Sequence, residues 1–528
     1  MSIDRRRFLK RGMAGLAATG LTATGCAPLG RTQPSGLPAG DRFRHGVASG
    51  DPLSDRVILW TRVTPSTEEA GQPVRTRWAI ALDKDFDQVV SRGERDARPD
   101  RDYTVKVDAD GLRPATDYYY RFEIAGTPSP IGRTRTLPTG SASHVRLAFA
   151  SCANYPAGYF NGYANMAERD DIDVVLHLGD YLYEYPNGEY GDGTELGRIP
   201  APDRETVALD DYRARHATYK TDADLQAAHA RHPWITIWDD HESANNSHNT
   251  GAQNHSPKTE GDWSIRKLAA IRAYSEWMPI RDLPTGLFRT FRFGNLLDLV
   301  MLDTRLHARD AVGGRKVEVA NDPERTLLGH DQTSWLLATL DESKRAGSTW
   351  RVVGQQVIVS PFSSNDFDFN PDAWDGYRAN RAQVLNHVDE NAIENVVFLA
   401  GDVHSSWAFE VPSADDARAS ASAIEFVTPA ISSPPIGRNP KVLELIDATA
   451  KFTPHLRYSN VIDQGYAILD LTQERARVEY IYTEPADRTR SASGTVGAVL
   501  ECAAGTHDID LVSKDESARR SDPRVSAG

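Results

Sequence analysis

Residues that can bind a metal ion or carry a proton follow five short apolar runs of this sequence. In chain order they are Ser151-Cys152, Gly179-Asp180, Asp239-Asp240-His241-Glu242, Asp303-Thr304-Arg305 and Gly401-Asp402-Val403-His404. Each run has the composition of a buried strand, and ligands of α/β sheets bind at the carboxyl ends of strands. A single Gly-Asp or Asp-x-His after a strand is usually only a turn. Their joint occurrence behind five runs indicates one shared site.

Carboxylates and imidazoles crowded at one edge of a sheet would repel one another strongly without counter-charge. Bound cations supply that charge most simply. Aspartate oxygens can bridge two metals, imidazole suits transition metals, and thiolate or phenolate favours a more acidic ion such as ferric iron. Two or more metals can clamp a phosphate oxygen, activate a water and stabilise the leaving oxygen. These residue types therefore predict metal-dependent hydrolysis of a phosphate ester.

From about residue 144 onward, short apolar runs alternate with stretches of helical composition. The apolar runs are 145–150, 174–178, 234–238, 297–302, 351–357 and 396–400. The helical stretches include 222–230, 265–277 and 332–344. This alternation is typical of an α/β domain with layered helices and sheets.

The preceding segment, residues 41–138, has the composition of a small β domain. Its strand-like segments are 57–62, 76–81, 103–107 and 118–122. Pro114 and Tyr118 form a pattern that resembles the tyrosine corner of fibronectin-type sandwiches. We therefore expect an all-β (fibronectin/Ig-like) sandwich. Since no group of catalytic residues occurs here, its expected role is structural or positioning.

The N-terminus resembles a twin-arginine export signal, with Arg5-Arg6-Arg7-Phe8-Leu9-Lys10 before a mild apolar stretch. That stretch is too short to span a membrane. Residues 1–27 are the predicted signal peptide, cleaved after Ala27, and 28–40 are a linker. Lipoprotein processing at Cys26 is the less favoured alternative. We expect export by the twin-arginine machinery to the periplasm, cell envelope or medium, without a transmembrane span after processing.

Composition limits the remaining function classes. The 528 residues are too many for one ordinary domain, and a net charge of −14 argues against a nucleic-acid scaffold. Metal ions can still make a local pocket attractive to an anionic phosphate ester. Three cysteines exclude a disulfide framework, although a Cys152–Cys502 pair stays open. Residues 486–528 are expected to be a tail, and the oligomeric state is not predicted.

At these motifs the chain resembles the calcineurin-like metallophosphoesterases, and within them the alkaline phosphatase D (PhoD) family. Asp240 stands where the wider group has Asn, Asp402 where it has His, and Cys152 where it has an acidic ligand. The motifs that match the PhoD branch include Ser151 to Tyr155, His177 to Tyr185, Trp238 to Glu242, Leu302 to Arg305, Gly354 to Val357 and Asp375 to Tyr377.

The resemblance implies a layered α-β-β-α catalytic domain over residues 144–485, with a ferric ion (Fe3+) beside calcium ions (Ca2+), two of which are expected. Carried over by motif, the iron ligands are Cys152, Asp180, Tyr183 and His404. The calcium ligands are Asp180, Asp240 and Asp402, with Asp239 and Gln356 as further candidates.

The resemblance also implies an exported alkaline phosphatase or phosphodiesterase. His241 would be the general acid, its pKa raised by a nearby carboxylate such as Glu242. Arg305 would contact phosphate oxygens, and Tyr377 and Arg378 would line the pocket. The alternatives are a phospholipase D-like or teichoic-acid-directed diesterase, or a non-catalytic phosphate- or metal-binding protein of the cell envelope.

Export gives the first testable prediction. Changing Arg5 and Arg6 together to Lys should trap the precursor in the cytoplasm, because the arginine pair is read as an address and not only as positive charge. Cell fractionation and detection of the uncleaved precursor measure this. Normal secretion of the double variant would indicate another export route.

Overall fold

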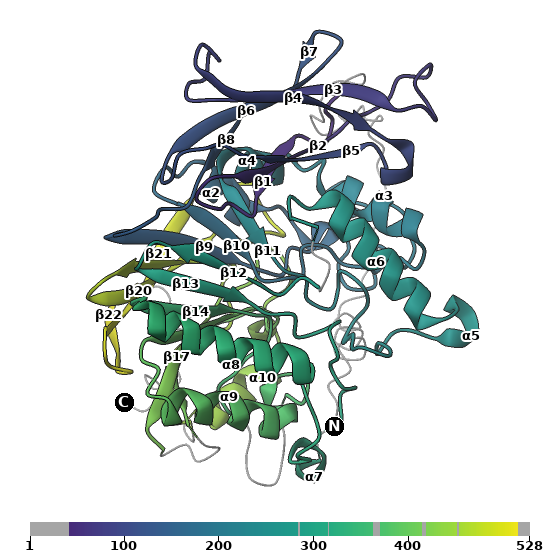
Figure 1. Cartoon of the computed structure of the whole chain (residues 1–528). Helices are drawn as coiled ribbons and strands as arrows, with labels where there is room; N and C mark the ends of the chain where they lie inside the picture. The colour runs from purple at the N-terminus through teal and green to yellow at the C-terminus, as the bar shows by residue number, and fades with distance from the viewer. Residues whose placement is uncertain are drawn as a thin grey trace, which may run out of the picture.

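The computed structural model describes residues 42–282, 286–314, 316–362, 370–413, 419–450 and 453–515 (Figure 1). The predicted signal peptide, the linker and Cys26 lie outside the described residues. Two large sheets stack in the body of the molecule, and a smaller sheet formed by strands within residues 74–135 lies at the top of Figure 1. The chain is thus a mixed α/β protein with an N-terminal β region.

The largest sheet has ten strands in the order β22-β21-β20-β19-β9-β10-β11-β1-β2-β5. In chain order the bounds are β1 Val47–Gly50, β2 Val57–Arg62, β5 Thr104–Ala109, β9 His144–Ala150, β10 Val174–His177, β11 Pro233–Thr236, β19 Gly465–Thr472, β20 Arg475–Thr483, β21 Gly494–Ala503 and β22 Ile509–Lys514. In the middle of this sheet, the adjacent strands β9, β10, β11 and β1 run parallel to one another. Their near-continuous apolar sequences reflect burial on both faces.

The second sheet has seven strands in the order β12-β13-β14-β15-β17-β16-β18. Their bounds are β12 Arg289–Phe293, β13 Leu297–Met301, β14 Trp350–Gly354, β15 Val396–Ala400, β16 Ser406–Pro412, β17 Ala421–Val427 and β18 Leu456–Asn460. One face, which includes Leu299 and Val352, shares a hydrophobic core with Leu147 and Leu176 of the ten-stranded sheet. Alternate side chains such as Val353 face the helices on the other side.

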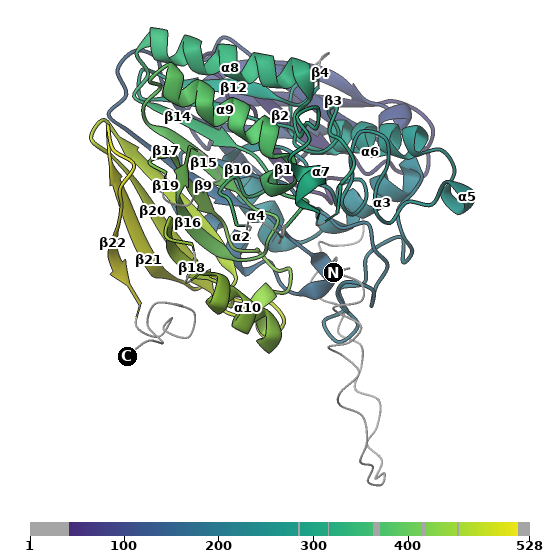
Figure 2. The same ribbon diagram turned by 90° about the horizontal axis from the view of Figure 1, so that it is seen from below.

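Helices cover the outer faces of the two sheets (Figures 1 and 2). The helices on the seven-stranded sheet are α8 Gly329–Ala346 and α9 Arg378–Glu390, which pack Leu336, Leu340, Val384 and Leu385 against it. The helices beside the ten-stranded sheet and the N-terminal region are α2 Asn161–Ala167, α3 Leu209–Tyr219, α4 Ala223–Arg231 and α6 Trp263–Trp277. The other α-helices in the described part of the chain are α5 Pro257–Glu260, α7 Val317–Ala320 and α10 Pro440–Ala450.

The N-terminal region is joined to the main body by backbone pairing. Its smaller sheet consists of β3 Val74–Ala81, β4 Val89–Ala97, β6 Asp117–Ile124, β7 Thr127–Pro128 and β8 Gly132–Arg135. This sheet shares a core with β2 and β5, including Leu59, Val105 and Tyr120. However, β1 pairs in parallel with β11, so β1, β2 and β5 continue the ten-stranded sheet. Strands from before and after residue 138 therefore belong to the same ten-stranded sheet.

Most elements inferred from composition occur where they were predicted. The six apolar runs correspond to β9, β10, β11, β13, β14 and β15, and the three helical stretches to α4, α6 and α8. The hydroxyl of Tyr118 accepts a hydrogen bond from the Arg113 backbone N–H at 2.7 Å, as a tyrosine corner requires.

Two expectations are corrected. The segment predicted as a C-terminal tail contains β21 and β22, which extend the ten-stranded sheet, and much of β21, including Leu500 and Cys502, is buried. Most of β22, the edge strand, is exposed, so its sequence lacks the continuous apolar run of a central strand. Cys152 and Cys502 are both free thiols, which excludes a disulfide between them.

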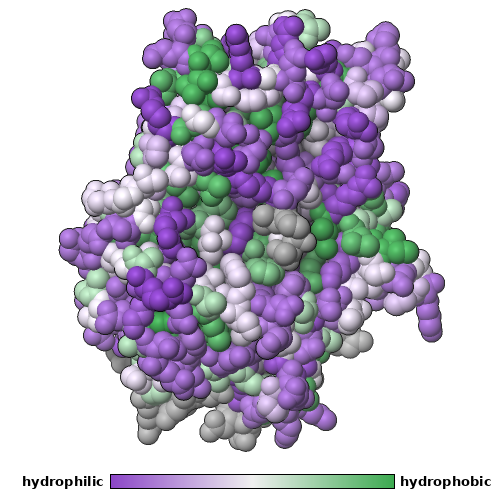
Figure 3. Space-filling model, viewed as in Figure 1, coloured by the Kyte–Doolittle hydropathy of each residue, from purple (hydrophilic) through white to green (hydrophobic). Residues whose placement is uncertain are grey.

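The surface is mainly hydrophilic on the face shown in Figure 3, with apolar residues in scattered groups. Among the described residues, the structure contains no helix that combines the length and the hydropathy needed to cross a bilayer.

A buried ion pair fastens the N-terminal region to the body and yields a prediction. Arg289 donates to Asp51 Oδ1 at 2.7 Å, and both side chains are at least 91% buried. Asp51→Ala would leave the guanidinium buried without its charged partner, although the carbonyls of Leu287 and Thr236 would still accept from it. We therefore expect the free energy of unfolding to fall by about 3–5 kcal/mol. Urea denaturation measures this. The control is Asp100→Ala, which breaks an exposed ion pair with Arg98 and should change little.

Equal losses in Asp51→Ala and Asp100→Ala would contradict a stabilising role for burial of the pair.

Candidate metal centre

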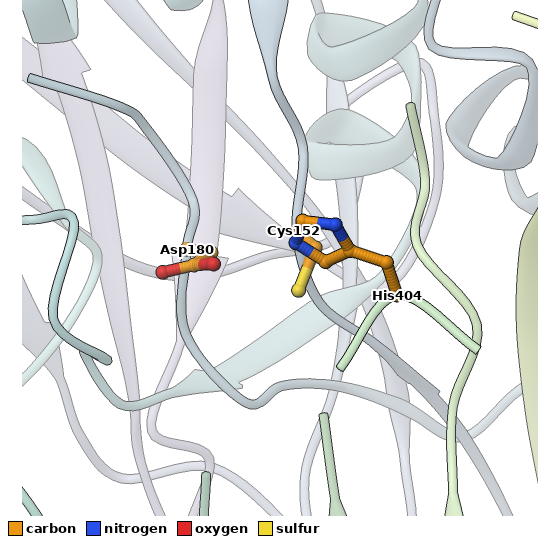
Figure 4. Close-up of side chains that lie close together, drawn as sticks. All are labelled: Cys152, Asp180 and His404. Atoms are coloured by element: carbon orange, nitrogen blue, oxygen red, sulfur yellow. The ribbon is translucent and has the colours of Figure 1, made fainter. Parts of the chain in front are cut away.

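The strand-end residues converge on one buried centre. Three overlapping groups place their ligand atoms within 4.8 Å of one another: Cys152 with Asp180 and His404, Asp180 with Asp240 and His241, and Asp239 with Asp240 and Asp402. Figure 4 shows the first group, with Cys152 and His404 close together and Asp180 beside them. Asp180 and Asp240 each belong to two groups, so the groups form one linked cluster.

The cluster lies where the carboxyl ends of both large sheets meet. Cys152 follows β9, Asp180 follows β10 and Asp240 follows β11, all in the ten-stranded sheet. Asp402 and His404 follow β15 of the seven-stranded sheet. All five side chains are at least 97% buried, so water does not screen their charges from one another.

The backbone turns sharply at these strand ends. Left-handed φ angles occur at Cys152 (61°), Asp180 (56°), Asp402 (63°) and His404 (54°). Such conformations cost about 1–3 kcal/mol each in residues other than glycine, and they concentrate at functional sites. Gly179 allows the β10 turn, since its φ is 106° and a Cβ there would lie 2.3 Å from the Asp239 Cβ.

Tyr183 lies among the first group of ligands. Its hydroxyl donates to Asp180 Oδ2 at 2.8 Å, accepts from Ser433 Oγ at 2.8 Å and lies 3.3 Å from His404 Nε2. His404 Nδ1 lies 3.1 Å from the carbonyl oxygen of Pro434. A carbonyl can only accept, so Nδ1 carries the hydrogen and the Nε2 lone pair faces the cluster.

Arg305 supplies positive charge to the carboxylates. Its fully buried guanidinium contacts Asp239, approaches Asp402 at 3.1 Å and Asp240 at 3.9 Å, and pairs with Asp372 at 2.7 Å. The N–H groups of Arg305 are directed at carboxylates. Its contact with phosphate stays a prediction.

Asp372 was missed in the sequence because it lies outside any strand-end motif. Arg305 and Arg309 both pair with it, at 2.7 and 2.6 Å. Burial alone would raise the pKa of Asp372, but the two guanidinium groups lower it. It is therefore a charged carboxylate that orients Arg305.

Several buried atoms fit a cation better than a hydrogen-bond donor. Asp180 Oδ1 and Asp239 Oδ2 have no hydrogen-bond partner among the residues that the structure describes. Burial raises the pKa of Asp180 and Asp239 well above the usual range, and neighbouring Asp240 adds to the effect. Multivalent cations would give these oxygens a partner and would reduce the repulsion between the aspartates.

The partner of His241 is Glu184 and not Glu242. Glu184 Oε2 lies 2.7 Å from His241 Nδ1. Glu242 instead accepts backbone N–H groups from Asp180 and Tyr181, at 3.1 and 2.6 Å, and so fixes the turn that carries Asp180. The prediction for Glu242 was wrong because both glutamates follow strand ends, and only the packing of the two loops decides which one faces the imidazole.

Glu184 and its neighbours set the charge of His241. Burial lowers the pKa of this imidazole, but Asp240, Glu184 and Asp180 raise it to about 10. The backbone N–H of Asn245 also donates to Glu184, at 2.8 Å, which holds the carboxylate in place.

Three further candidates form hydrogen bonds with neighbouring loops. The amide of Gln356 accepts from the Thr304 N–H at 3.0 Å and donates to the Leu302 carbonyl at 2.9 Å, so it ties two loops together. Tyr377 donates to the Asp310 carbonyl at 2.8 Å, and Arg378 Nε contacts the Asp375 carbonyl at 3.4 Å. These contacts give each residue a structural role, and its role as a ligand or in the pocket wall stays a prediction.

An α/β fold that gathers carboxylate, imidazole and thiol groups at converging strand ends defines a hydrolytic enzyme with a candidate metal centre. The chain belongs to the PhoD-like phosphatase family. The family model matches residues 147–480, and the model of the family's N-terminal domain matches residues 31–138. The chain is therefore a phosphoric ester hydrolase.

Individual relatives agree with this assignment. The chain is 37% identical over 512 residues to alkaline phosphatase D of Bacillus subtilis (strain 168), which covers 92% of this chain and 86% of that protein. The solved structure of PhoD superposes with a TM-score of 0.81 at 35% identity, covering 92% of this chain and 94% of that one.

The Glu184–His241 pair gives a prediction for the metal-free protein. With a raised pKa, His241 contributes stability fully below the ordinary imidazole pKa of about 6.5, and this contribution is lost as the pH rises through about 10. Glu184→Gln should lower the titration midpoint of the imidazole, measured by NMR of labelled histidine.

The matched control is Glu205→Gln, because Glu205 bonds to the same Asn254 side chain as Glu184 but has no contact with His241 among the hydrogen bonds and ion pairs described. An unchanged midpoint in Glu184→Gln would assign the raised pKa to the aspartates alone.

Proposed function

We propose that this chain is an exported alkaline phosphatase or phosphodiesterase with a multinuclear iron–calcium centre. The observation that supports this most directly is the linked cluster of buried ligand atoms, in which Asp180 and Asp240 are shared. Shared carboxylates suit a centre with several ions, since carboxylate oxygens can bridge metals.

The donor set differs between the two sides of the cluster. Cys152, Tyr183 and His404 on one side suit iron, and Asp180 can bridge to the other side. Asp239, Asp240 and Asp402 offer only oxygens, as calcium prefers. When bound, such ions polarise the phosphate ester, stabilise developing charge and lower the pKa of water.

The chain's own residues orient the ester and move a proton. His241, held through Nδ1 by Glu184, presents Nε2–H to the leaving oxygen and can donate its proton there. Arg305 balances the charge of Asp239 and Asp402, and Glu242 keeps the turn at Asp180 in shape. Removal of Glu184 should therefore slow esters with poor leaving groups most, because these depend on proton donation.

The cellular location and finer architecture are part of the same proposal. The N-terminal sequence supports twin-arginine export to an extracytoplasmic location, with cleavage after Ala27 favoured over lipidation of Cys26. The packing of helices outside two stacked sheets supports the α-β-β-α description. The shared core of β2, β5 and the smaller sheet supports a sandwich at residues 41–138.

Elemental analysis of protein purified without added metal tests the metal proposal. We expect about one iron and one or more calcium ions per chain, with a purple charge-transfer band if Tyr183 binds ferric iron as phenolate. Activity on a chromogenic phosphate ester, and comparison of mono- and diesters, tests the catalytic part. Zinc as the only metal, without visible absorption, would contradict the assignment.

Cys152→Ser tests the thiol ligand. Burial and the nearby Asp180 raise the pKa of this thiol, so a cation is needed to displace its proton. The variant should lose iron, colour and activity while it keeps its fold by circular dichroism. Cys502→Ser is the matched control, since Cys502 is also a buried free thiol but lies in β21. Wild-type activity in Cys152→Ser would remove Cys152 from the centre.

A further inference from the structure

Tyr190 is an aromatic side chain beside the cluster to which neither the motifs nor the ligand groups assign a role. Its ring stacks on Tyr183, with centroids 5.3 Å apart and an angle of 26° between the planes. It is also nearly parallel to the ring of His241, at 5.9 Å and 19°. Its hydroxyl lies 3.2 Å from His404 Nδ1. Tyr190 therefore touches residues from three separate strand-end segments.

Exposure distinguishes Tyr190 from the aromatic rings around it. Tyr183, Tyr185 and His241 are at least 95% buried, whereas Tyr190 is partly exposed. It thus lies between the buried cluster and solvent, on the side of the two histidines. A substrate group that remains outside the cluster after the phosphate has entered would meet this ring.

The segment around Tyr190 is held in a defined shape. The backbone N–H of Gly188 donates to the Gly191 carbonyl at 2.8 Å. The side chain of Asn187 donates to Asp192 at 2.9 Å and accepts from the Gly193 N–H at 2.8 Å. Because the turn is fixed on both sides of Tyr190, the ring is preorganised and loses little freedom when a ligand packs against it.

The charges of the site determine which part of a substrate reaches Tyr190. The phosphate would be drawn to cations among Asp180, Asp239 and Asp240, and the leaving oxygen to His241 Nε2, which lies in the same ligand group as Asp180. The leaving group then extends away from the carboxylates and past the ring that stacks beside His241. An aromatic ring there offers a flat apolar face.

We propose that Tyr190 is a specificity-determining residue that forms the wall for the leaving group and favours phosphate esters with aromatic or heteroaromatic leaving groups over small alkyl esters. This inference rests on the proposed function. Aromatic pairs contribute about 0.5–1.5 kcal/mol beyond burial, which corresponds to a preference of about 2- to 12-fold.

The experiment compares two non-hydrolysable ligands, phenylphosphonate and methylphosphonate, as competitive inhibitors and by calorimetry on the metal-loaded enzyme. Tyr190→Leu should weaken phenylphosphonate by about 3- to 10-fold and leave methylphosphonate within about twofold. Tyr190→Phe, which removes only the hydroxyl near His404, should keep the preference. Tyr190→Trp, with a larger face, should increase it.

The matched control is Tyr119→Leu, the same change at a partly exposed tyrosine of β6 in the smaller sheet, which should alter neither ligand. If Tyr190→Leu weakened the binding of both phosphonates equally, or changed neither, Tyr190 would not contact the leaving group and its role would be purely structural. Failure of the metal-loaded wild type to hydrolyse any phosphate ester would instead overturn the proposed function, so the two failures are distinguishable.

Discussion

Mutual repulsion of buried carboxylates is the constraint on which the rest of this structure depends. Asp180, Asp239, Asp240 and Asp402 are each at least 99% buried within one cluster. Charges at such separations interact far more strongly than they would in water. The fold holds these groups together by covalent connection to rigid strands, and it must provide positive charge to make the arrangement tolerable.

The protein supplies part of that charge itself. Arg305 lies against three of the aspartates, and Asp372 anchors it from the other side. His241 carries a second positive charge, stabilised by Glu184. Arg305 contacts Asp239 and Asp402, whereas His241 lies in a group with Asp180 and Asp240. Asp180 belongs both to the group that contains Cys152 and to the group that contains Asp240. Its carboxylate is therefore the most favourable place for two metal ions to share a ligand.

The sequence was sufficient to predict the convergence of the site, because its determinants are local. A short apolar run followed at once by Asp180 or Asp240 identifies a strand end, and parallel strands bring their ends together. Which glutamate pairs with His241 depends instead on how two loops pack against each other. The local sequence does not determine that packing. The same holds for Asp372 and Tyr190, which reach the site from irregular segments. At the C-terminal edge, half-exposed strands lack the continuous apolar pattern that revealed the central ones.

The order of strands in the ten-stranded sheet has a consequence for the synthesis of the protein. β9, which leads to Cys152, lies between β10 and β19, and β19 begins only at Gly465. While the ribosome is still translating the middle of the chain, one backbone edge of β9 has no strand beside it. The central sheet can close only after almost the whole polypeptide has emerged, so folding of this part is largely post-translational. Until then the apolar strand β9 presents an open edge, the kind of surface that chaperones cover in nascent chains.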